Sequence, residues 1–163
     1  MTSAHDGIRR LGEGLRWEET PAGFSFRTFA RTLTEADLIN FVSLCGFTEP
    51  LFTDARHAAE GSYTGRLVPA ALTYAMAEGL VLQTNALNGT GLAFMHMELD
   101  VRRPVYVGDT IDVVVEVTES RATSKPGRGV VSAINTVFNQ RGEEVLRYTP
   151  VRLIRGRDFE PAT

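Results

Sequence analysis

The segment from Pro69 to Val81 limits the possible folds more than any other part of the sequence. As a helix it is apolar almost all round, and it is rich in alanine. A helix that is apolar on every side is buried, and small side chains allow a sheet to pack closely around it. Proline suits the first turn of a helix, where its missing N–H would have no partner. The segment therefore predicts a long, buried central helix.

The residues after Gly91 have the pattern of strands. Four stretches, 92–101, 111–117, 130–138 and 145–154, are rich in apolar and β-branched residues. The connections between them contain residues that are typical of turns. Proline cannot donate to a sheet ladder, so Pro150 indicates a bulge or an edge position. We expect a single α+β domain in which an antiparallel sheet wraps around the central helix.

Before the central helix, the pattern predicts a strand around residues 24–28 and two small helices. Thr34 and Asp37 have the spacing of a capping box at the start of the first helix. Gly46 is expected to end this helix. Its apolar stripe includes Cys45, which we expect to be a buried core thiol.

Length and composition restrict the kind of protein. The 163 residues suit one domain, which we expect at 17–155, with a flexible arm at 1–16 and a tail at 156–163. The net charge of −3 argues against nucleic acid as the main partner. The single cysteine excludes an internal disulfide and a cysteine-based zinc site, and no metal is expected. Without a long apolar run, no membrane span is expected, and a cytoplasmic location is the default.

Two stretches resemble the MaoC-like dehydratases, also called (R)-specific enoyl-CoA hydratases. The first is TEADLINFVSLCGFTEPLFTD at 34–54, followed by GRLVPAAL at 65–72, and the second is RPVYVGDT at 103–110. The resemblance covers roughly 17–155 and implies a hot-dog fold, no cofactor, and an acyl thioester of coenzyme A or of a carrier protein as the partner. Hot-dog sheets usually join edge to edge, so a homodimer, a dimer-based oligomer or a heteromeric hot-dog pair is expected.

The loop that carries the chemistry of the family is altered here. In the family it reads Gly-Asp-x-Asn-Pro-x-His, and the Asp and His activate a water molecule for addition to a 2-enoyl thioester. Gly46 and Pro50 match this pattern, but Phe47 occupies the Asp position, Glu49 the Asn position and Phe52 the His position. Phenylalanine cannot transfer a proton, so the usual pair of catalytic groups is absent.

Three residues are candidates for a replacement acid or base. Glu49 lies in the altered loop, where the two phenylalanines would desolvate it and raise its pKa; the alternative is a solvated loop glutamate. His57 follows in a predicted short helix that Asp54 caps, and the alternative is a surface histidine. Glu78 lies on the central helix, where some hot-dog thioesterases place a catalytic carboxylate; the alternative is a helix-end carboxylate that reaches solvent.

The resemblance also implies a binding site. In the family, a backbone N–H at the turn into the central helix polarises the thioester carbonyl, and Ala70 and Ala71 can supply this donor here. Arg103, with other basic residues near strand ends, can meet the phosphates of the carrier, or can simply be solvated. Tyr63 can hydrogen-bond the substrate or border the core. The predicted substrate-binding residues are Phe47, Phe52, Tyr63, Ala70, Ala71 and Arg103.

Three functions remain open from the sequence. The first is a divergent lyase, either an enoyl-thioester hydratase or a 3-hydroxyacyl-thioester dehydratase, that uses another group as its base. The second is a non-catalytic acyl-binding subunit that pairs with a catalytic partner. The third is a thioesterase on the same fold, in which Glu78 or Glu49 activates water. Fold alone does not decide among them.

Overall fold

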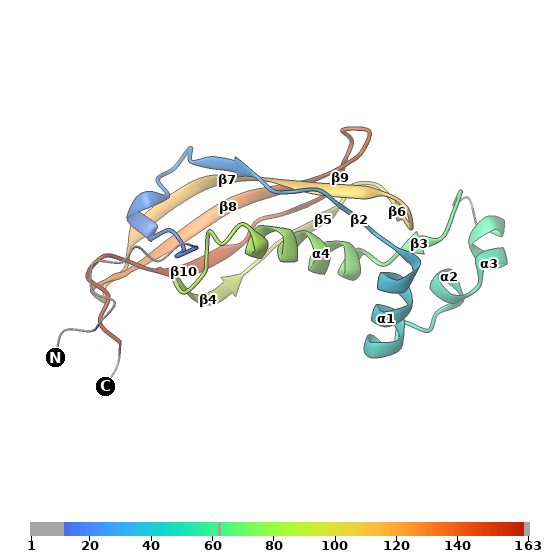
Figure 1. Cartoon of the computed structure of the whole chain (residues 1–163), viewed down its shortest axis with the longest axis horizontal. Helices are drawn as coiled ribbons and strands as arrows, with labels where there is room; N and C mark the ends of the chain where they lie inside the picture. The colour runs from blue at the N-terminus through green and yellow to red at the C-terminus, as the bar shows by residue number, and fades with distance from the viewer. Residues whose placement is uncertain (1–11, 62, 162–163) are drawn as a thin grey trace.

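The computed structural model describes residues 12–61 and 63–161, so most of the predicted arm and the last two residues of the predicted tail lie outside the described residues. In chain order, the elements are η1 (Trp17–Glu19), β1 (Ser25–Arg27), β2 (Arg31–Thr32), α1 (Glu35–Cys45), α2 (Pro50–Thr53), α3 (Ala55–Glu60), β3 (Leu67–Val68), α4 (Ala70–Gln83), β4 (Gly91–His96), β5 (Leu99–Val101), β6 (Val105–Tyr106), β7 (Thr110–Ala122), β8 (Arg128–Asn139), β9 (Glu144–Tyr148) and β10 (Val151–Arg155) (Figure 1).

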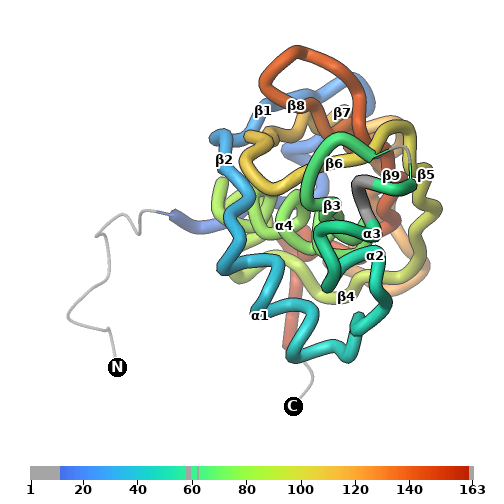
Figure 2. The backbone as a smooth tube through the Cα atoms, turned by 90° about the vertical axis from the view of Figure 1, so that its right-hand side faces the viewer, coloured from blue at the N-terminus to red at the C-terminus, as the bar shows by residue number. Residues whose placement is uncertain are grey.

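The main sheet has eight strands and is antiparallel throughout. Its order is β1–β7–β8–β10–β4, with β2 joined to β7, and β9 joined to both β8 and β5. A separate pair, β3 and β6, lies beside it. The sheet curves over α4, and α1, α2 and α3 gather at one end of the molecule (Figures 1 and 2). The predicted α+β hot-dog domain is confirmed.

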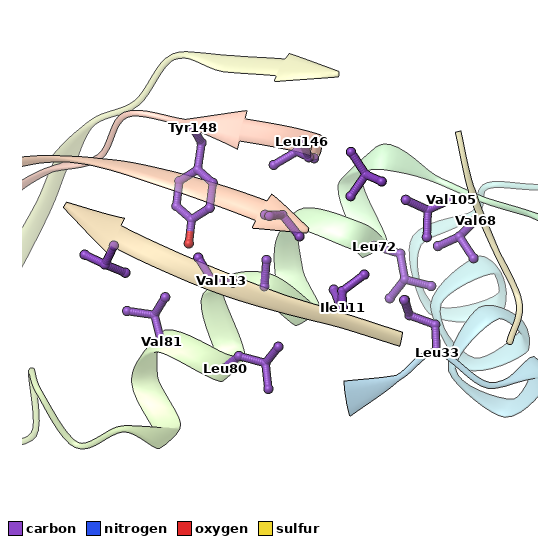
Figure 3. Packing of buried hydrophobic residues seen from close by; sticks show 14 of the residues in the cluster. Leu33, Val68, Leu72, Leu80, Val81, Val105, Ile111, Val113, Leu146 and Tyr148 are labelled. Carbon is purple, nitrogen blue, oxygen red and sulfur yellow. The ribbon is translucent and has the colours of Figure 1, made fainter. Parts of the chain in front are cut away.

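The core lies between α4 and the inner face of the sheet (Figure 3). Alternate residues of β7 and β8 point inward, as the period of two in a strand requires. Each large aliphatic side chain that is fully buried contributes about 1.5–3 kcal/mol, so this contact stabilises the position of α4. The buried side chains include Leu72, Leu80 and Val81 from α4, Ile111 and Val113 from β7, and Leu146 and Tyr148 from β9.

Helix α4 is less buried than its sequence predicts. Ala71 and Ala75 are exposed, and Leu82 is 52% exposed. The expectation of burial on every side is wrong for the single chain, because the sheet covers only one face of the helix. Among the described residues, no helix is long and apolar enough to cross a membrane.

The long strands extend beyond the helix that they cover. At about 1.5 Å per residue the 14 residues of α4 span about 21 Å, whereas the 13 residues of β7 span about 43 Å at about 3.3 Å per residue. Beyond the end of α4, η1 packs on β7 and β8 instead. Trp17 forms a second small core there with Leu87 and Val117. The inner face of the sheet is therefore covered by two separate parts of the chain.

Most local signals before α4 are confirmed, but two expectations are wrong. Where two small helices were expected, the structure has three, α1, α2 and α3. Thr34 caps α1 in a capping box with Asp37, and Gly46 ends the helix in the left-handed conformation at φ 72°. The prediction that Cys45 is a buried core thiol is wrong, because this residue is exposed. Only Leu38 and Val42 of α1 are buried, since the last turn of the helix extends away from the sheet.

Two of the predicted strands are each divided in two. The stretch 92–101 forms β4 and β5, and the stretch 145–154 forms β9 and β10. Pro150 lies in the second break, where it has no N–H to offer a neighbouring strand. The two breaks face each other, because β4 pairs with β10 and β5 pairs with β9. Pro150 thus lies at an interruption of the sheet that the β9–β10 break shares with the neighbouring β4–β5 break.

Candidate functional site

A pocket of about 370 Å³ opens at the N-terminus of α4. Its walls come from α2, the segment before β3, the first turns of α4, and the β5–β6 connection. The lining is mainly apolar with a few polar groups, which is typical of a small-molecule site. The lining residues are Phe52, Tyr63, Leu67, Val68, Ala70, Thr73, Val101, Arg102, Arg103, Pro104, Val105 and Leu146.

The first turn of α4 has free backbone N–H donors at the N-terminal end of the helix, beside the pocket. Pro69 is the N-cap residue, and the first hydrogen bond of the helix runs from Thr73 N to Pro69 O at 3.0 Å. The N–H groups of the first helical residues have no partner within a helix, and the helix dipole makes this end positive. Ala70 lines the pocket, whereas Ala71 is exposed and does not. The predicted carbonyl-binding donor at Ala70 therefore lies in the pocket wall.

Two arginines lie at the rim of the pocket. Arg103 donates from Nη1 to the backbone carbonyl of Glu144 at 2.8 Å, which holds the stem of the side chain in place. Arg102 forms ion pairs with Asp100 at 3.1 Å and with Glu144 at 3.5 Å. Both residues are exposed. Within the described part of the chain, Arg103 takes part in no salt bridge, so its charge is available to an anionic group of a ligand.

Three phenylalanines pack together at this end of the molecule, and two of them, Phe47 and Phe52, are those that the resemblance predicts in place of the family's acid–base pair. The rings of Phe41 and Phe47 have centroids 5.1 Å apart, and those of Phe47 and Phe52 are 6.1 Å apart, both in tilted arrangements. Phe52 lines the pocket, whereas Phe47 packs against Phe52 and is 36% exposed. The loop thus supplies an aromatic side chain, Phe52, to the wall of the pocket.

Glu49 lies outside this wall. It is the N-cap residue of α2, and its backbone carbonyl accepts hydrogen bonds from Phe52 N at 2.9 Å and from Thr53 Oγ1 at 3.1 Å. Its side chain makes no capping hydrogen bond, and the residue is exposed. The desolvation that we expected from the neighbouring phenylalanines is not found, because the turn directs the residue to the surface. Glu49 does not line the pocket.

His57 and Asp54 belong to the short helices at the same end of the molecule. Asp54 accepts hydrogen bonds from the backbone N of Arg56 at 2.9 Å and from its guanidinium. These bonds from Arg56 hold the pKa of Asp54 below its ordinary value. His57 is exposed on α3 and does not line the pocket. The structure thus places Asp54 just before α3, paired with Arg56, and His57 on the surface.

Glu78 takes part in a buried polar cluster on the other side of α4. Its carboxylate accepts hydrogen bonds from Arg152 Nη2 at 2.8 and 2.9 Å and from the Tyr148 hydroxyl at 2.9 Å. The side chains of Glu78 and Arg152 are only 16% and 10% exposed. Burial, and then the Glu78 carboxylate, raise the pKa values of Tyr148 and Tyr74, so both phenols stay protonated. Glu78 is engaged in this cluster and does not line the pocket.

The structure thus brings together part of the predicted site. Phe52, Tyr63, Ala70 and Arg103 meet in one pocket, whereas Phe47, Ala71, Glu49, His57 and Glu78 do not line it. No group of three or more His, Cys, Asp or Glu within 12–61 and 63–161 is arranged to hold a metal ion.

Thr73 belongs to the pocket but was not predicted from the sequence. Thr73 lies one turn after Ala70 on the same face of α4, is 1% exposed and lines the pocket. Its hydroxyl donates to the Pro69 carbonyl at 3.3 Å. A polar residue three positions after the helix start, within an alanine-rich helix, was the available signal.

Comparisons with known proteins agree with this architecture. The family described as "MaoC like domain" matches residues 19–138. No curated protein sequence matches the chain. Among solved structures, a monoamine oxidase regulatory protein from Archaeoglobus fulgius is 31% identical, with a TM-score of 0.81 over 88% of this chain and 96% of that chain.

Two further solved structures are informative. A MaoC-like dehydratase from Rhodospirillum rubrum is 25% identical, with a TM-score of 0.78 over 90% of this chain and all of that chain, 100%. A conserved hypothetical protein from Mycobacterium tuberculosis, described as having a double hot-dog fold, is 24% identical with a TM-score of 0.81. The match covers 94% of this chain but 48% of that one, so this chain corresponds in length to one of two units.

Proposed function

The chain belongs to the MaoC-like domain family, and on that premise we propose that it binds an acyl thioester of coenzyme A or of a carrier protein without hydrating it. One observation carries the proposal. The pocket at the start of α4 has an apolar lining, helix donors and two arginines, but none of the described side chains that line it bears a carboxylate or an imidazole.

The binding mode follows from the positions of the polar groups. The thioester carbonyl lies at the Ala70 N–H, where the positive end of the helix stabilises the partial charge on its oxygen. The acyl chain lies against the apolar wall that includes Phe52 and Leu146. The phosphates of the carrier lie at the rim, where Arg103 and Arg102 donate charge-assisted hydrogen bonds.

Hydration needs a group that takes a proton from water and another that gives one to carbon. Besides the two arginines, the side-chain polar groups in the described pocket wall are the hydroxyls of Tyr63 and Thr73. A lyase or a thioesterase would need Glu49, His57 or Glu78 to reach the substrate. None of them lines the pocket, so the geometry favours the acyl-binding subunit over both enzymes.

We further propose that a second hot-dog subunit covers the free side of α4. β4 is an edge strand of the main sheet, and it carries Phe94 and Met95, which are 47% and 57% exposed. Leu82 of α4 is exposed and, with Phe94, lines a hollow that α4 and β4 share and that Glu78 and Arg152 also reach. An apolar edge strand of this kind is a pairing site. The chain is expected to form a homodimer, and a heteromeric pair would supply the catalytic groups that this pocket lacks.

A small panel of thioesters tests the proposed function. The chain is mixed with crotonyl-CoA, 3-hydroxybutyryl-CoA and butyryl-CoA, and calorimetric binding, enoyl absorbance and free thiol are followed in parallel. We expect binding without loss of the enoyl and without thiol release. Turnover of the enoyl would show a lyase, thiol release would show a thioesterase, and a lack of binding to all three would overturn the proposal.

A matched pair of variants tests the position of the phosphates. Arg103→Gln should weaken binding of butyryl-CoA about 10-fold, since a hydrogen bond to a charged group contributes about 1.5–3 kcal/mol. Arg121→Gln is the control, because Arg121 lies at the opposite end of β7 and pairs with Glu119. Butyryl-pantetheine lacks the nucleotide phosphates, so the parent chain and both variants should bind it equally well. Equal binding of butyryl-CoA by all forms would place its phosphates elsewhere.

A further inference from the structure

The difference in length between α4 and the long strands leaves an enclosed space at the far end of the helix. Figure 1 shows η1 over the part of the sheet that α4 does not reach. Between the residues that flank η1, the end of α4 and the sheet lies a pocket of about 50 Å³, with no lining residue in common with the thioester pocket. Its walls are mainly aliphatic and aromatic side chains, among them Phe24, Val81, Leu87, Val115 and Ile154.

The enclosed space continues into a groove on the surface. This groove has a volume of about 570 Å³ and shares Leu15, Phe24, Phe26 and Ala86 with the enclosed pocket. Phe29 lies in its wall and is 73% exposed. Together the two spaces form one apolar cleft, open at the surface beside Phe29 and closed inside the fold.

At the closed end of the cleft, Asn135 is a polar residue without a partner. It is 1% exposed and lines the enclosed pocket. Neither Oδ1 nor Nδ2 makes a hydrogen bond to any described residue. Its neighbour across the β8–β9 ladder is Tyr148, whose hydroxyl proton goes to Glu78. Burial raises the pKa of Tyr148 and the nearby Asn135 amide opposes this rise, but the amide does not reach hydrogen-bond geometry with the hydroxyl. An unsatisfied buried amide costs about 1–3 kcal/mol, whereas a leucine would fit this apolar wall without that cost. The amide therefore indicates an occupant of the cleft.

The charges around the closed end select the kind of occupant. Arg152 also lines the enclosed pocket, but its charge is already compensated by Glu78 at 2.8 Å. A carboxylate ligand would leave a net negative charge in a low-dielectric site, which is unfavourable. The Asn135 amide offers one acceptor and one donor group, so an uncharged hydroxyl, which donates and accepts, is the group that satisfies both.

We infer that the chain has a second binding site, separate from the thioester pocket, for an uncharged amphiphile. The hydroxyl of this ligand binds the amide of Asn135, and its apolar part lies in the cleft between β1, the end of α4 and the residues that flank η1. The site goes beyond the proposed function and does not depend on it.

1-Hexanol is the probe for this site, and hexanoate of similar length is the charged control. Binding of each is followed in the full chain through the chemical shifts of the Asn135 side-chain amide and of the groove residues. We expect 1-hexanol to shift both sets of resonances and hexanoate to shift neither. Asn135→Leu should weaken 1-hexanol binding about fivefold, since it loses the hydrogen bonds of the amide.

Two further variants keep the test independent of folding and of the other pocket. Phe29→Ala changes an exposed residue, so it should fold and still weaken 1-hexanol binding. Arg103 lines the thioester pocket, so Arg103→Gln should leave 1-hexanol binding unchanged. Saturation of the thioester pocket with butyryl-CoA should also leave it unchanged. Three results would each overturn the inference. They are binding of 1-hexanol by Asn135→Leu as tight as that of the parent chain, displacement of 1-hexanol by butyryl-CoA, and magnetisation transfer to Asn135 from water alone.

Discussion

Replacing Glu78 with glutamine should unfold the protein more easily, because it leaves the charge of Arg152 buried without a counter-ion. The Arg152 side chain is 10% exposed, and the Glu78 side chain is 16% exposed. Breaking a buried ion pair costs about 3–5 kcal/mol. Glutamine keeps one carbonyl acceptor for Arg152 or Tyr148, so we expect a loss of about 2–3 kcal/mol. For a domain of this size, the loss lowers Tm by about 4–12 °C.

Urea unfolding measures this loss directly. The single tryptophan, Trp17, packs against the sheet and reports unfolding through its fluorescence. Glu119→Gln is the matched control, since its pair with Arg121 is 55% and 59% exposed, and it should cost less than about 1 kcal/mol.

A double-mutant cycle separates the ion pair from other effects of the substitutions. Arg152→Met alone should be destabilising, because it leaves the carboxylate of Glu78 buried without a counter-ion. The combination of Arg152→Met with Glu78→Gln should cost less than the sum of the two single changes. Additive losses, or a loss below about 1 kcal/mol for Glu78→Gln, would refute the view that the pair is a buried, mutually dependent unit.

Three further predictions concern backbone conformation and pH. Gly129→Ala should lower stability by about 1–3 kcal/mol and change the fluorescence of Trp17, because a Cβ there overlaps the indole ring. Gly46→Ala should cost about 1–2 kcal/mol in urea unfolding, because this residue has φ 72°. Hydrogen bonds from Thr34 lower the pKa of Asp37, so its carboxylate stabilises the fold above the unfolded pKa of about 3.9, and this contribution is lost as pH falls through the lower folded value. Asp37→Asn should therefore be less stable at pH 7, and its urea midpoint should fall less than that of the parent between about pH 5 and pH 3.

Features that depend on neighbouring residues were predictable from the sequence. The capping box of Thr34 and Asp37, and the left-handed Gly46, are determined within one turn of chain. The central helix was predictable because its composition excludes a solvated surface helix. Pro150 marked the interruption of its strand because proline lacks an N–H, whichever strands lie beside it.

Features that depend on distant residues were not predictable. The partner of Glu78 is 74 positions away in sequence, and Arg152 lies in a strand pattern that gives no sign of an ion pair. Burial of Cys45 was predicted from helical periodicity, but periodicity does not show where the sheet ends. The expected desolvation of Glu49 failed for a similar reason, because the turn before α2 sets the direction of the residue independently of its aromatic neighbours.

The positions of Gly14 and Asp158, near the two limits of the described residues, have a practical consequence. The Gly14 N–H donates a hydrogen bond to Asn88 O, in the α4–β4 connection, at 2.8 Å. Asp158 packs on Gly127, beyond the end of β7. The pocket at the start of α4 lies near the opposite end of this strand, a distance of about 40 Å at about 3.3 Å per residue. Tethering the protein to a sensor surface through either terminus should therefore leave the mouth of the pocket facing the solution, so a carrier as large as an acyl-carrier protein would approach it unobstructed.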